Sequence, residues 1–490
     1  MENKTMMQYF EWYLPSNGMF WDRCAAQAKN LKENGINMLW LPPAYKGAKG
    51  STSVGYDVYD TYDLGEFLQK GTVRTKYGTK EQYIKAVKTL KKCGIEVYAD
   101  IVLNHMMGAD ELEEVYAVEN NAKNRDEQIG EKCKRTVWTR FTFPGRNGRY
   151  SRFKWNHNHF SGTDWDEGEK QSGIFLFDGK QWNNETDDEF SNFDYLMGAD
   201  LDMDNKQTVK AVTDWGKWYL RTVKPDGFRL DAVKHIRFEF YRDWLKNLRE
   251  YAGRDFFAVG EYWSSEIDKL THYLDVVENS MSLFDVPLHF SFQSAATSNG
   301  QYDMRNLLKD TLVKVRPQNA VTFVDNHDTQ PGQSLYSFIP AWFKPIAYSI
   351  ILLQKEGLPC VFYGDYYGIP NDNIPPVVSL KKLIYIRKKY AYGEQEDYFD
   401  DDSVVGFVRT GDDEHENSGL AVLMTNAECG SKKMKVGERF ASQLFFNVMD
   451  LAAIPVTIDS DGTGEFYVNG GSVSVWVNGN AYRDICLNVE

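Results

Sequence analysis

The sequence predicts an α/β fold, a (β/α)₈ TIM barrel that carries an inserted domain after its third strand and ends in an all-β sandwich. Three observations support this architecture. Short apolar runs alternate with amphipathic stretches through most of the 490 residues, one interval of about 125 residues interrupts the alternation, and short alternating strands with Gly and Asp turns follow Tyr392. A chain of this length is also too long for a single compact core.

The barrel is predicted from eight β-type runs, most of them followed by a helix-like stretch. Their apolar, unalternating composition indicates strands buried on both faces, and repeated βαβ units favour a closed parallel barrel. The runs are Met7–Trp12, Ile36–Leu41, Ile95–Val102, Gly227–Asp231, Phe256–Glu261, Leu283–Pro287, Ala320–Val324 and Pro359–Tyr363. The predicted helices are Trp21–Asn34, Glu81–Cys93, Gln207–Thr222, Phe238–Ala252, Met304–Val315 and Trp342–Glu356.

Two further segments lie outside the barrel pattern. The excess between the third and fourth strands is poor in helical periodicity, and a structureless loop of that length is implausible, so we predict an inserted domain. The tail contains the alternating runs Val404–Arg409, Gly419–Thr425, Gly464–Val468 and Ser472–Val477, typical of an all-β domain. The expected limits are 1–104 and 207–395 for the barrel, 105–206 for the inserted domain and 396–490 for the sandwich.

Composition excludes several classes of function. The net charge of −14 and the lack of a basic patch argue against nucleic-acid binding. The sequence contains no stretch of about 18 apolar residues that would predict a membrane span. The six cysteines form no CxxC pair and do not read as a disulfide framework, and no signal peptide is visible. We therefore expect a cytoplasmic protein, and a monomer.

Polar and ionisable residues follow four of the predicted strands at the same end, where barrel enzymes carry their reactive side chains. A single carboxylate there is more often a helix N-cap or a loop ion pair, but four coincident clusters favour a catalytic site. The clusters are Asp100, Asn104 and His105 after strand three; Arg229, Asp231, Lys234 and His235 after strand four; Glu261 and Trp263 after strand five; and His327 and Asp328 after strand seven.

Two of these carboxyl groups suit the cleavage of a glycosidic bond, which needs one ionised carboxylate and one protonated acid in different environments. Asp231 lies two residues after Arg229, so both side chains leave an extended strand on the same face. A guanidinium beside Asp231 is expected to lower its pKa and keep it a nucleophile. Glu261, next to apolar and aromatic residues, is expected to hold a proton as the acid/base.

The four clusters resemble the four signature regions of the α-amylase family, glycoside hydrolase family 13, and the similarity extends over nearly the whole chain. It is closest to the subgroup of bacterial liquefying and cytoplasmic α-amylases. The resemblance implies that Asp231 is the nucleophile, Glu261 the acid/base and Asp328 the carboxylate that binds and distorts the sugar at the cleavage point. It also implies that Arg229 orients the nucleophile and that two histidines hold hydroxyls of that sugar, His105 and His327.

Further motifs narrow the resemblance. Lys234 and His235 match a pair that contacts the sugar on the far side of the scissile bond, and Trp263 matches an aromatic residue that stacks on a sugar on that side. Tyr56, in Gly55-Tyr56-Asp57, is similar to the tyrosine that stacks on the sugar at the cleavage point. Without this motif, Tyr56 could equally belong to the core.

The resemblance also implies calcium, a hard cation that prefers oxygen ligands. The expected ligands are Asn104, Asp194, Asp200 and the backbone carbonyl of His235. Read without the family, the aspartates could instead be a solvated acidic loop. The liquefying enzymes hold a calcium–sodium–calcium cluster with additional aspartates, but Ser161 and Asn183 stand at the matching positions. We therefore expect one calcium ion and no cluster, and no transition metal at His157 and His159.

The sequence is thus expected to encode an endo-acting retaining α-amylase that hydrolyses internal α-1,4 bonds of starch, glycogen or maltodextrins, with an α-glucan as its partner molecule. One alternative is an α-glucan transglycosylase, in which an acceptor hydroxyl replaces water. A second is a non-catalytic glucan-binding protein, against which the intact carboxyl groups argue. An inverting hydrolase is disfavoured because it requires carboxyl groups about 6.5–9.5 Å apart instead of about 5–5.5 Å.

Overall fold

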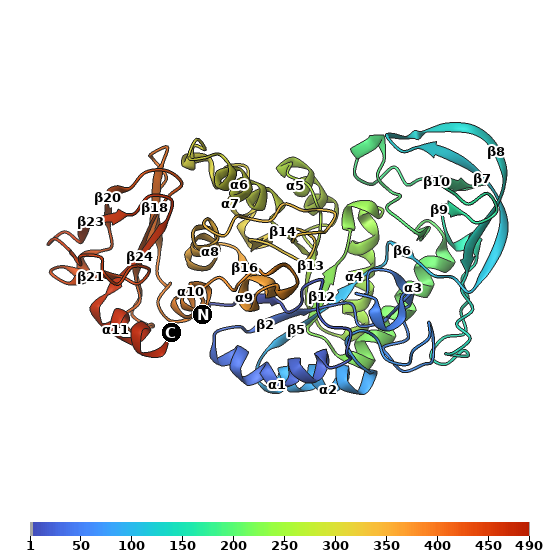
Figure 1. Cartoon of the computed structure of the whole chain (residues 1–490), viewed down its shortest axis with the longest axis horizontal. Coiled ribbons are helices and arrows are strands. Elements are labelled where there is room, and N and C mark those ends of the chain that lie inside the picture. Colours follow the sequence, from blue (N-terminus) through green and yellow to red (C-terminus); the bar gives the residue numbers. More distant parts are fainter. Residues whose placement is uncertain (1–2, 490) are drawn as a thin grey trace.

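The structure is a computed structural model that describes residues 3–489. Figure 1 shows three bodies in a row along the longest axis of the molecule. The barrel lies in the centre, the segment between β5 and α3 lies at one end, and the C-terminal sheets lie at the other. The predicted fold class, with an insertion after the third barrel strand and a C-terminal all-β region, is confirmed.

Eight parallel strands close the barrel in the order β1-β16-β15-β14-β13-β12-β5-β2. All of their residues are buried except the partly buried first residues of β5, β13 and β16, which explains their unalternating apolar pattern. The strands are β1 (Met6–Gln8), β2 (Met38–Leu41), β5 (Glu96–Ile101), β12 (Gly227–Leu230), β13 (Phe257–Gly260), β14 (Ser282–Phe284), β15 (Ala320–Phe323) and β16 (Leu358–Phe362).

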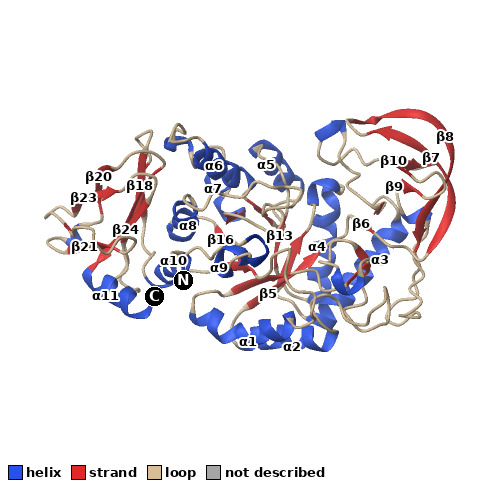
Figure 2. Cartoon of the chain, in the orientation of Figure 1, coloured by secondary structure: helices blue, strands red, loops and turns tan. Residues whose placement is uncertain are grey.

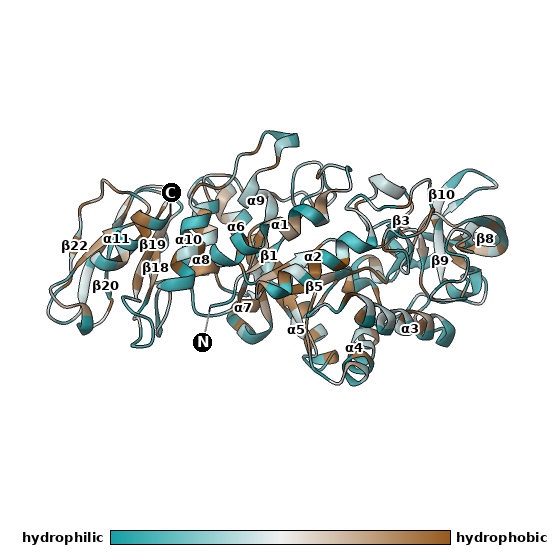
Figure 3. Cartoon of the chain, turned by 90° about the horizontal axis from the view of Figure 1, so that it is seen from below, coloured by the Kyte–Doolittle hydropathy of each residue, from teal (hydrophilic) through white to brown (hydrophobic). Residues whose placement is uncertain are grey.

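Helices surround this barrel, and Figure 2 shows them outside its strands. Figure 3 shows hydrophobic residues in the barrel strands and a mixture of hydrophilic and hydrophobic residues along the helices around them. No helix within residues 3–489 is long and apolar enough to cross a membrane. The helices around the barrel are α1 (Phe20–Glu33), α2 (Lys80–Lys92), α3 (Lys206–Val223), α4 (Phe238–Ala252), α5 (Ile267–Val276), α6 (Val286–Thr297), α7 (Leu312–Val315), α8 (Lys344–Leu353), α9 (Tyr363–Tyr367) and α10 (Leu380–Lys389). The last helix, α11 (Gly479–Asn488), packs on β21 and β24 of the C-terminal region.

Local chemistry explains where two elements differ from the predictions. The predicted strand Leu283–Pro287 ends early because Asp285 caps α6, accepting a hydrogen bond from the N–H of Leu288 at 3.1 Å. The predicted helix Met304–Val315 is wrong. It is a 3₁₀ turn (η5, Met304–Asn306) and the short α7, separated by Asp310 in the left-handed region at φ 54°. Helices α5, α6, α9, α10 and α11 have no counterpart among the predicted helices.

Short 3₁₀ segments connect the larger elements. They are η1 (Gly50–Thr52), η2 (His157–His159), η3 (Glu189–Ser191), η4 (Val233–His235), η6 (Pro317–Asn319), η7 (Pro370–Asp372) and η8 (Glu438–Phe440), besides η5. Two of them bear on the site described below, because η3 belongs to the insertion and η4 follows barrel strand β12 directly.

The insertion is built on a four-stranded antiparallel sheet in the order β8-β7-β10-β9. Its chain enters and leaves through a two-stranded ribbon in which His105 pairs with Asp200 and Met106 with Ala199. The strands are β6 (His105–Met106), β7 (Glu111–Asn121), β8 (Asn124–Arg140), β9 (Gly162–Asp166), β10 (Gln171–Phe177) and β11 (Ala199–Asp200). The domain limits given above remain a prediction.

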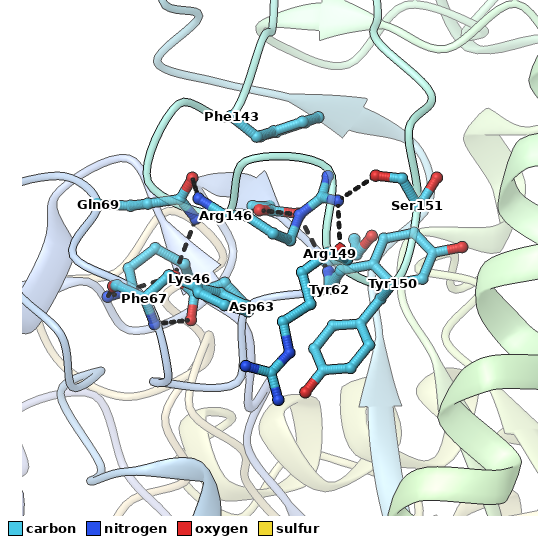
Figure 4. A network of polar contacts seen from close by, with 12 residues as sticks. Lys46, Tyr62, Asp63, Phe67, Gln69, Phe143, Arg146, Arg149, Tyr150 and Ser151 are labelled. Carbon is cyan, nitrogen blue, oxygen red and sulfur yellow. Dashed lines mark hydrogen bonds and ion pairs between the residues drawn. The ribbon is translucent and has the colours of Figure 1, made fainter.

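A second antiparallel ribbon, β3 (Lys46–Gly47) with β4 (Val58–Asp60), lies in the loop after β2. Figure 4 shows the polar network that ties this loop to the insertion. The buried ammonium of Lys46 donates to the carbonyls of Thr72 and Val73 at 2.7 Å each, and Arg146 Nε donates to Asp60 Oδ2 at 2.8 Å. Lys46 therefore holds the loop together internally, and Arg146 ties it to the insertion.

The C-terminal region is a six-stranded antiparallel sheet, in the order β17-β18-β19-β24-β21-β22, and a two-stranded sheet of β20 and β23. One apolar cluster, which includes Val404, Met434, Phe466 and Trp476, joins residues of both sheets. The strands are β17 (Gln395–Tyr398), β18 (Val404–Arg409), β19 (Leu420–Thr425), β20 (Gly430–Lys435), β21 (Leu444–Asn447), β22 (Val456–Thr457), β23 (Thr463–Val468) and β24 (Val473–Asn478).

Candidate active site

A cleft of about 400 Å³ opens at the carboxyl ends of the barrel strands. It brings together most of the site residues predicted from the sequence, and residues of the insertion form part of its wall. The lining residues are Trp12, Tyr56, His105, Glu189, Phe193, Leu196, Met197, Asp231, Ala232, Lys234, His235, Glu261, Trp263, Asp328, Ser334 and Leu335. The predicted site residues Arg229 and His327 are fully buried and do not line the cleft. Arg229 contacts Asp231, and His327 contacts Asp328.

The floor of the cleft is organised around one buried cation. Arg229, on β12, donates through Nη1 to Asp231 Oδ1 at 2.6 Å and through Nη2 to Glu261 Oε2 at 2.6 Å. Its Nη1 also donates to Asp100 Oδ1 at 2.9 Å. The second oxygen of Asp100 accepts from Tyr56 Oη at 2.8 Å and from Trp40 Nε1 at 2.9 Å. One guanidinium therefore holds three carboxyl groups in a fixed geometry.

The charge of Arg229 acts on the pKa of Asp231 in the expected direction, but the expectation of a lowered pKa is wrong, because the pKa of Asp231 is raised overall. Burial raises the pKa of Asp231, and the attraction of Arg229 only opposes that rise. Burial also raises the pKa of Glu261; Arg229 opposes this and the charge of Asp231 adds to it. The side chains of Asp231 and Glu261 are 10% and 9% exposed, so desolvation exceeds the effect of one cation shared by three carboxyl groups.

The two oxygens of Glu261 differ in their surroundings. The charge of Asp231 adds to the rise in the pKa of Glu261, while the N–H of Ala232 opposes that rise. Glu261 Oε2 already accepts from Arg229, whereas Oε1 is buried and has no hydrogen-bond partner among residues 3–489. Oε1 is therefore the oxygen of Glu261 that is left to bind a ligand.

The turn after β15 carries His327 and Asp328. Gln8 Nε2 donates to His327 Nδ1 at 2.9 Å, which leaves the ring proton on Nε2. This Nε2 lies 3.2 Å from Asp328 Oδ2. Burial lowers the pKa of His327 far below its usual value, so the ring is neutral and can donate to a hydroxyl group. Burial raises the pKa of Asp328, and the negative charge of Glu261 raises it further.

Three rings form a stacked series at one side of the cleft. Tyr56 stacks on His327 at 4.9 Å with an interplanar angle of 12°, and Trp12 stacks parallel to Tyr56 at 6.1 Å and 2°. His105 supports the series from the backbone, because its Nε2 lies 2.8 Å from the carbonyl of Tyr56. Its Nδ1 lies 3.3 Å from Asn104 Nδ2, so the protein engages both ring nitrogens of His105.

Sequence reasoning missed two residues of this site. Trp12 follows the first strand at the same edge as the polar clusters, but an aromatic residue there is indistinguishable from a core residue by pattern. Asp100 lies inside β5 and was noted without a role. Its partner Arg229 comes from the neighbouring strand, where register sets Asp100 opposite Arg229. That register was the missing signal.

Lys234 and His235 join the barrel to the insertion. Lys234 Nζ pairs with Glu189 Oε2 at 2.8 Å, and His235 Nδ1 lies 2.8 Å from the carbonyl of Phe193. Burial lowers the pKa of His235 to about 3, so the ring is neutral. Both residues follow Ala232, whose left-handed backbone (φ 50°) turns the chain sharply after Asp231.

The residues predicted to bind calcium lie at the junction of the insertion and the barrel. Asp194 and Asp200 are 7% and 2% exposed, and burial raises the pKa of both. The charges of Asp204 and Asp202 add to the rise for Asp194, and the charge of Asp194 adds to it for Asp200. Asn104 Oδ1 is buried and accepts no hydrogen bond within the described chain. Buried carboxylates and an unused amide oxygen fit a hard cation.

Asn183 and Ser161, at the positions where additional aspartates would enlarge the set of calcium ligands, bind at this junction through their backbone. The backbone N–H of Asn183 donates to Asp194 Oδ2 at 3.0 Å, and the N–H of Ser161 donates to the carbonyl of Asp200 at 2.9 Å. Neither residue brings a carboxylate. From residue 3 to residue 489, no three His, Cys, Asp or Glu side chains group as a metal site. A site with Asp194 and Asp200 as its only carboxylates does not require such a group.

Comparisons with known proteins agree over most of the chain. The family described as "Alpha amylase, catalytic domain" matches residues 25–417. The α-amylase of Geobacillus stearothermophilus is 54% identical over 478 residues, 97% of this chain and 87% of that protein. The α-amylase of Bacillus licheniformis is 50% identical over 479 residues, 97% and 93% of the two chains.

A cytoplasmic α-amylase of Escherichia coli strain K12 is 44% identical over 495 residues, covering 97% of this chain and 99% of that protein. Among solved structures, an Anoxybacillus α-amylase superimposes with a TM-score of 0.65 at 19% identity and 97% coverage of both chains, a likeness of fold. The matches run through the barrel, the insertion and the C-terminal sheets. The chain belongs to the α-amylase family.

Proposed function

We propose that the protein is an endo-acting, retaining α-amylase that hydrolyses internal α-1,4 bonds of starch, glycogen or maltodextrins. The observation that carries this proposal is the arrangement at the floor of the cleft. Asp231 and Glu261 are held by the two terminal nitrogens of Arg229, each at 2.6 Å. Two carboxyl groups held by one guanidinium suit a covalent mechanism better than a water-spanning inverting one.

In the first step Glu261 donates its proton through Oε1 to the leaving glycosidic oxygen, while Asp231 attacks the anomeric carbon and forms a glycosyl-enzyme. In the second step Glu261, now ionised, removes a proton from water, which attacks the same carbon and releases Asp231. Arg229 stays in place through both steps. It stabilises each carboxylate as it becomes charged.

The other residues hold the sugar. Asp328 lines the cleft and accepts from sugar hydroxyls, and the neutral His327 lies directly behind it and donates from Nε2, which is 3.2 Å from Asp328 Oδ2. Tyr56 and Trp12 offer a flat apolar surface on one side, and Trp263, packed 5.9 Å from Phe290, offers a second. His105, with both ring nitrogens engaged, acts here by holding Tyr56 as well as by lining the cleft.

The function is tested by the products formed from soluble starch and from a reduced maltodextrin series. We expect a rapid fall in viscosity and internal cleavage of the reduced chains, with α-anomeric products first in the NMR spectrum. β-Anomeric products, or release of sugars from one chain end alone, would reject the proposal. Longer products that grow with added acceptor sugar would identify a transglycosylase instead.

We also propose one calcium ion, held by Asn104, Asp194, Asp200 and the carbonyl of His235. When bound, the ion would offset the charge of two buried carboxylates and tie the insertion to the barrel. The carbonyl of His235 belongs to η4, which follows the proposed nucleophile. Ordering this junction also orders one wall of the cleft, since Lys234, Glu189 and Phe193 meet there.

Chelation should lower both the melting temperature and the activity, and added calcium should restore both. A ligand that binds only the folded state adds about 2.7 kcal/mol of stability at a hundredfold excess over Kd. Because Ser161 and Asn183 bring no carboxylate, metal analysis should find one calcium per chain, and sodium should not be needed. Two or three tightly held ions would contradict the role given to these substitutions. An unchanged melting temperature under chelation would remove the site.

The cytoplasm is the proposed compartment. All six cysteines lie within the described residues and none of them forms a disulfide, as suits a reducing environment. The relative named as a cytoplasmic α-amylase also matches over almost its whole length. Stored glycogen or imported maltodextrins would then be the substrates, and we propose that the enzyme acts on them as a monomer.

A further inference from the structure

A buried ion triad lies beneath the turn that carries Asp328. Lys344, at the start of α8, pairs with Asp325 Oδ2 at 2.8 Å and with Asp365 on α9. Tyr348 donates to the second oxygen of Asp365 at 2.6 Å. The side chains of the triad are 2% exposed or less, and none of them lines the cleft. The triad therefore does not contact a bound glucan.

One hydroxyl group links the triad to the turn. Thr329 Oγ1 donates to Asp325 Oδ1 at 2.9 Å and accepts from the N–H of Asn326 at 3.0 Å. Asn326 Oδ1 in turn accepts from the N–H groups of Asp328 and Thr329 at 2.8 and 2.9 Å. A continuous chain of contacts thus runs from Lys344 to the backbone of Asp328.

The turn is also held on its outer side. Asp325 accepts from the N–H of Ile339 at 3.3 Å, and the N–H of Ser337 donates to the carbonyl of Thr329 at 3.3 Å. His289 lies between the carbonyl of Val324 at 2.7 Å and Ser337 Oγ at 2.8 Å. The loop from Thr329 to Ile339, which lines the cleft through Ser334 and Leu335, is therefore also bound to Asp325.

The cost of the triad argues for a role beyond stability. Two carboxylates and one ammonium are removed from water, and well-packed apolar residues of similar volume often give a core of equal or greater stability. What a charged triad adds is a unique geometry, because the ammonium fixes the orientation of the carboxylate it binds. Asp325 is such a carboxylate, three residues before Asp328.

We propose that Lys344 is a positioning residue for Asp328, acting through Asp325 and Thr329. The proposal rests on the function proposed above for Asp328, which is to bind the sugar at the cleavage point and distort it. Distortion is expressed most strongly in the transition state, so a displaced Asp328 should lower kcat more than it raises KM. A displacement of about 1 Å can cost about 10²-fold in rate.

The test compares Lys344→Met, Thr329→Val and Thr329→Ser on an aryl α-maltotrioside. We expect Lys344→Met and Thr329→Val to lower kcat by about 10- to 100-fold with KM changed less than about threefold. Thr329→Ser keeps the hydroxyl group and should stay near wild type. Tyr348→Phe, which removes a bond on the far side of the triad, should also leave kcat near wild type.

A double-mutant cycle with Asp328→Asn separates positioning from general damage. If Lys344 acts through Asp328, adding Lys344→Met or Thr329→Val to Asp328→Asn should cause little further loss of kcat. Fully multiplicative losses, or a wild-type kcat in Thr329→Val, would overturn the inference. Should Lys344→Met fail to fold, the comparison of Val with Ser at position 329 still decides. Full activity of Asp328→Asn alone would instead refute the role proposed for Asp328.

Discussion

Asp231→Asn and Glu261→Gln should each lower kcat on soluble starch by about 10³-fold or more while the thermal unfolding midpoint stays close to wild type. Asparagine cannot form the glycosyl-enzyme, and glutamine cannot give a proton to the leaving oxygen. Both replacements keep the volume and the contacts with Arg229. Steady-state kinetics and thermal unfolding measure the two quantities. Asp243→Asn, on an exposed aspartate of α4, is the matched control.

The leaving group and the pH distinguish the two roles. With a leaving group that needs no proton, Glu261→Gln should recover much of the first step, whereas Asp231→Asn should not. Activity should fall as the pH rises through the pKa of Glu261, because only the acid can donate. Burial raises that pKa and so moves this limb to higher pH. Glu261→Gln should lose the limb; more than a few per cent of wild-type starch activity in both variants would reject the assignment.

Arg229→Met should cost stability as well as activity. The substitution leaves Asp100, Asp231 and Glu261 buried without their common cation, and removing one partner of a buried ion pair costs about 3–5 kcal/mol. Without the guanidinium, the folded-state pKa values of these carboxyl groups rise further above the unfolded values. The folded variant then binds more protons than the unfolded one, so its stability falls as the pH rises.

Urea unfolding of this variant at pH 5 and pH 8 measures the effect. We expect the loss relative to wild type to be larger at pH 8, with activity absent at both. Arg229→Lys retains a charge but not the two-nitrogen fork, so it should recover part of the stability and little of the activity. An Arg229→Met protein as stable as wild type at pH 8 would show that the three carboxyl groups do not depend on Arg229.

The barrel strands could be predicted because burial on both faces leaves a strong apolar pattern. The site could be predicted because polar residues such as Asp231 and Glu261 end such strands at one edge. What could not be predicted depends on contacts between distant segments. The two-sided bonding of Arg229 is one case, since nothing in its own strand indicates that Glu261 shares the guanidinium. The net rise in the pKa of Asp231 is another, because burial is a property of the folded chain.

Local signals also failed where the backbone leaves the regular pattern. The apolar spacing of Met304–Val315 fits a helix, but the left-handed Asp310 interrupts the segment. The long hairpin of β7 and β8 has mostly exposed residues in β8, so it lacks the alternation that predicts a strand. The hairpin forms through the pairing of β8 with β7, and β7 in turn pairs with β10.

The ribbon of β6 and β11 has a consequence for how such a protein can change. The chain departs from the barrel at His105 and returns at Asp200 on the adjacent strand, so both ends of the insertion meet at one point. Lengthening a segment whose ends are already joined costs little, because loop-closure entropy grows only slowly with length. The insertion can thus change in length at segments away from the barrel, while the ribbon and the contacts of Asp60, Lys234 and His235 keep it beside the cleft. Such changes would let substrate preference evolve while the cleavage chemistry stays constant.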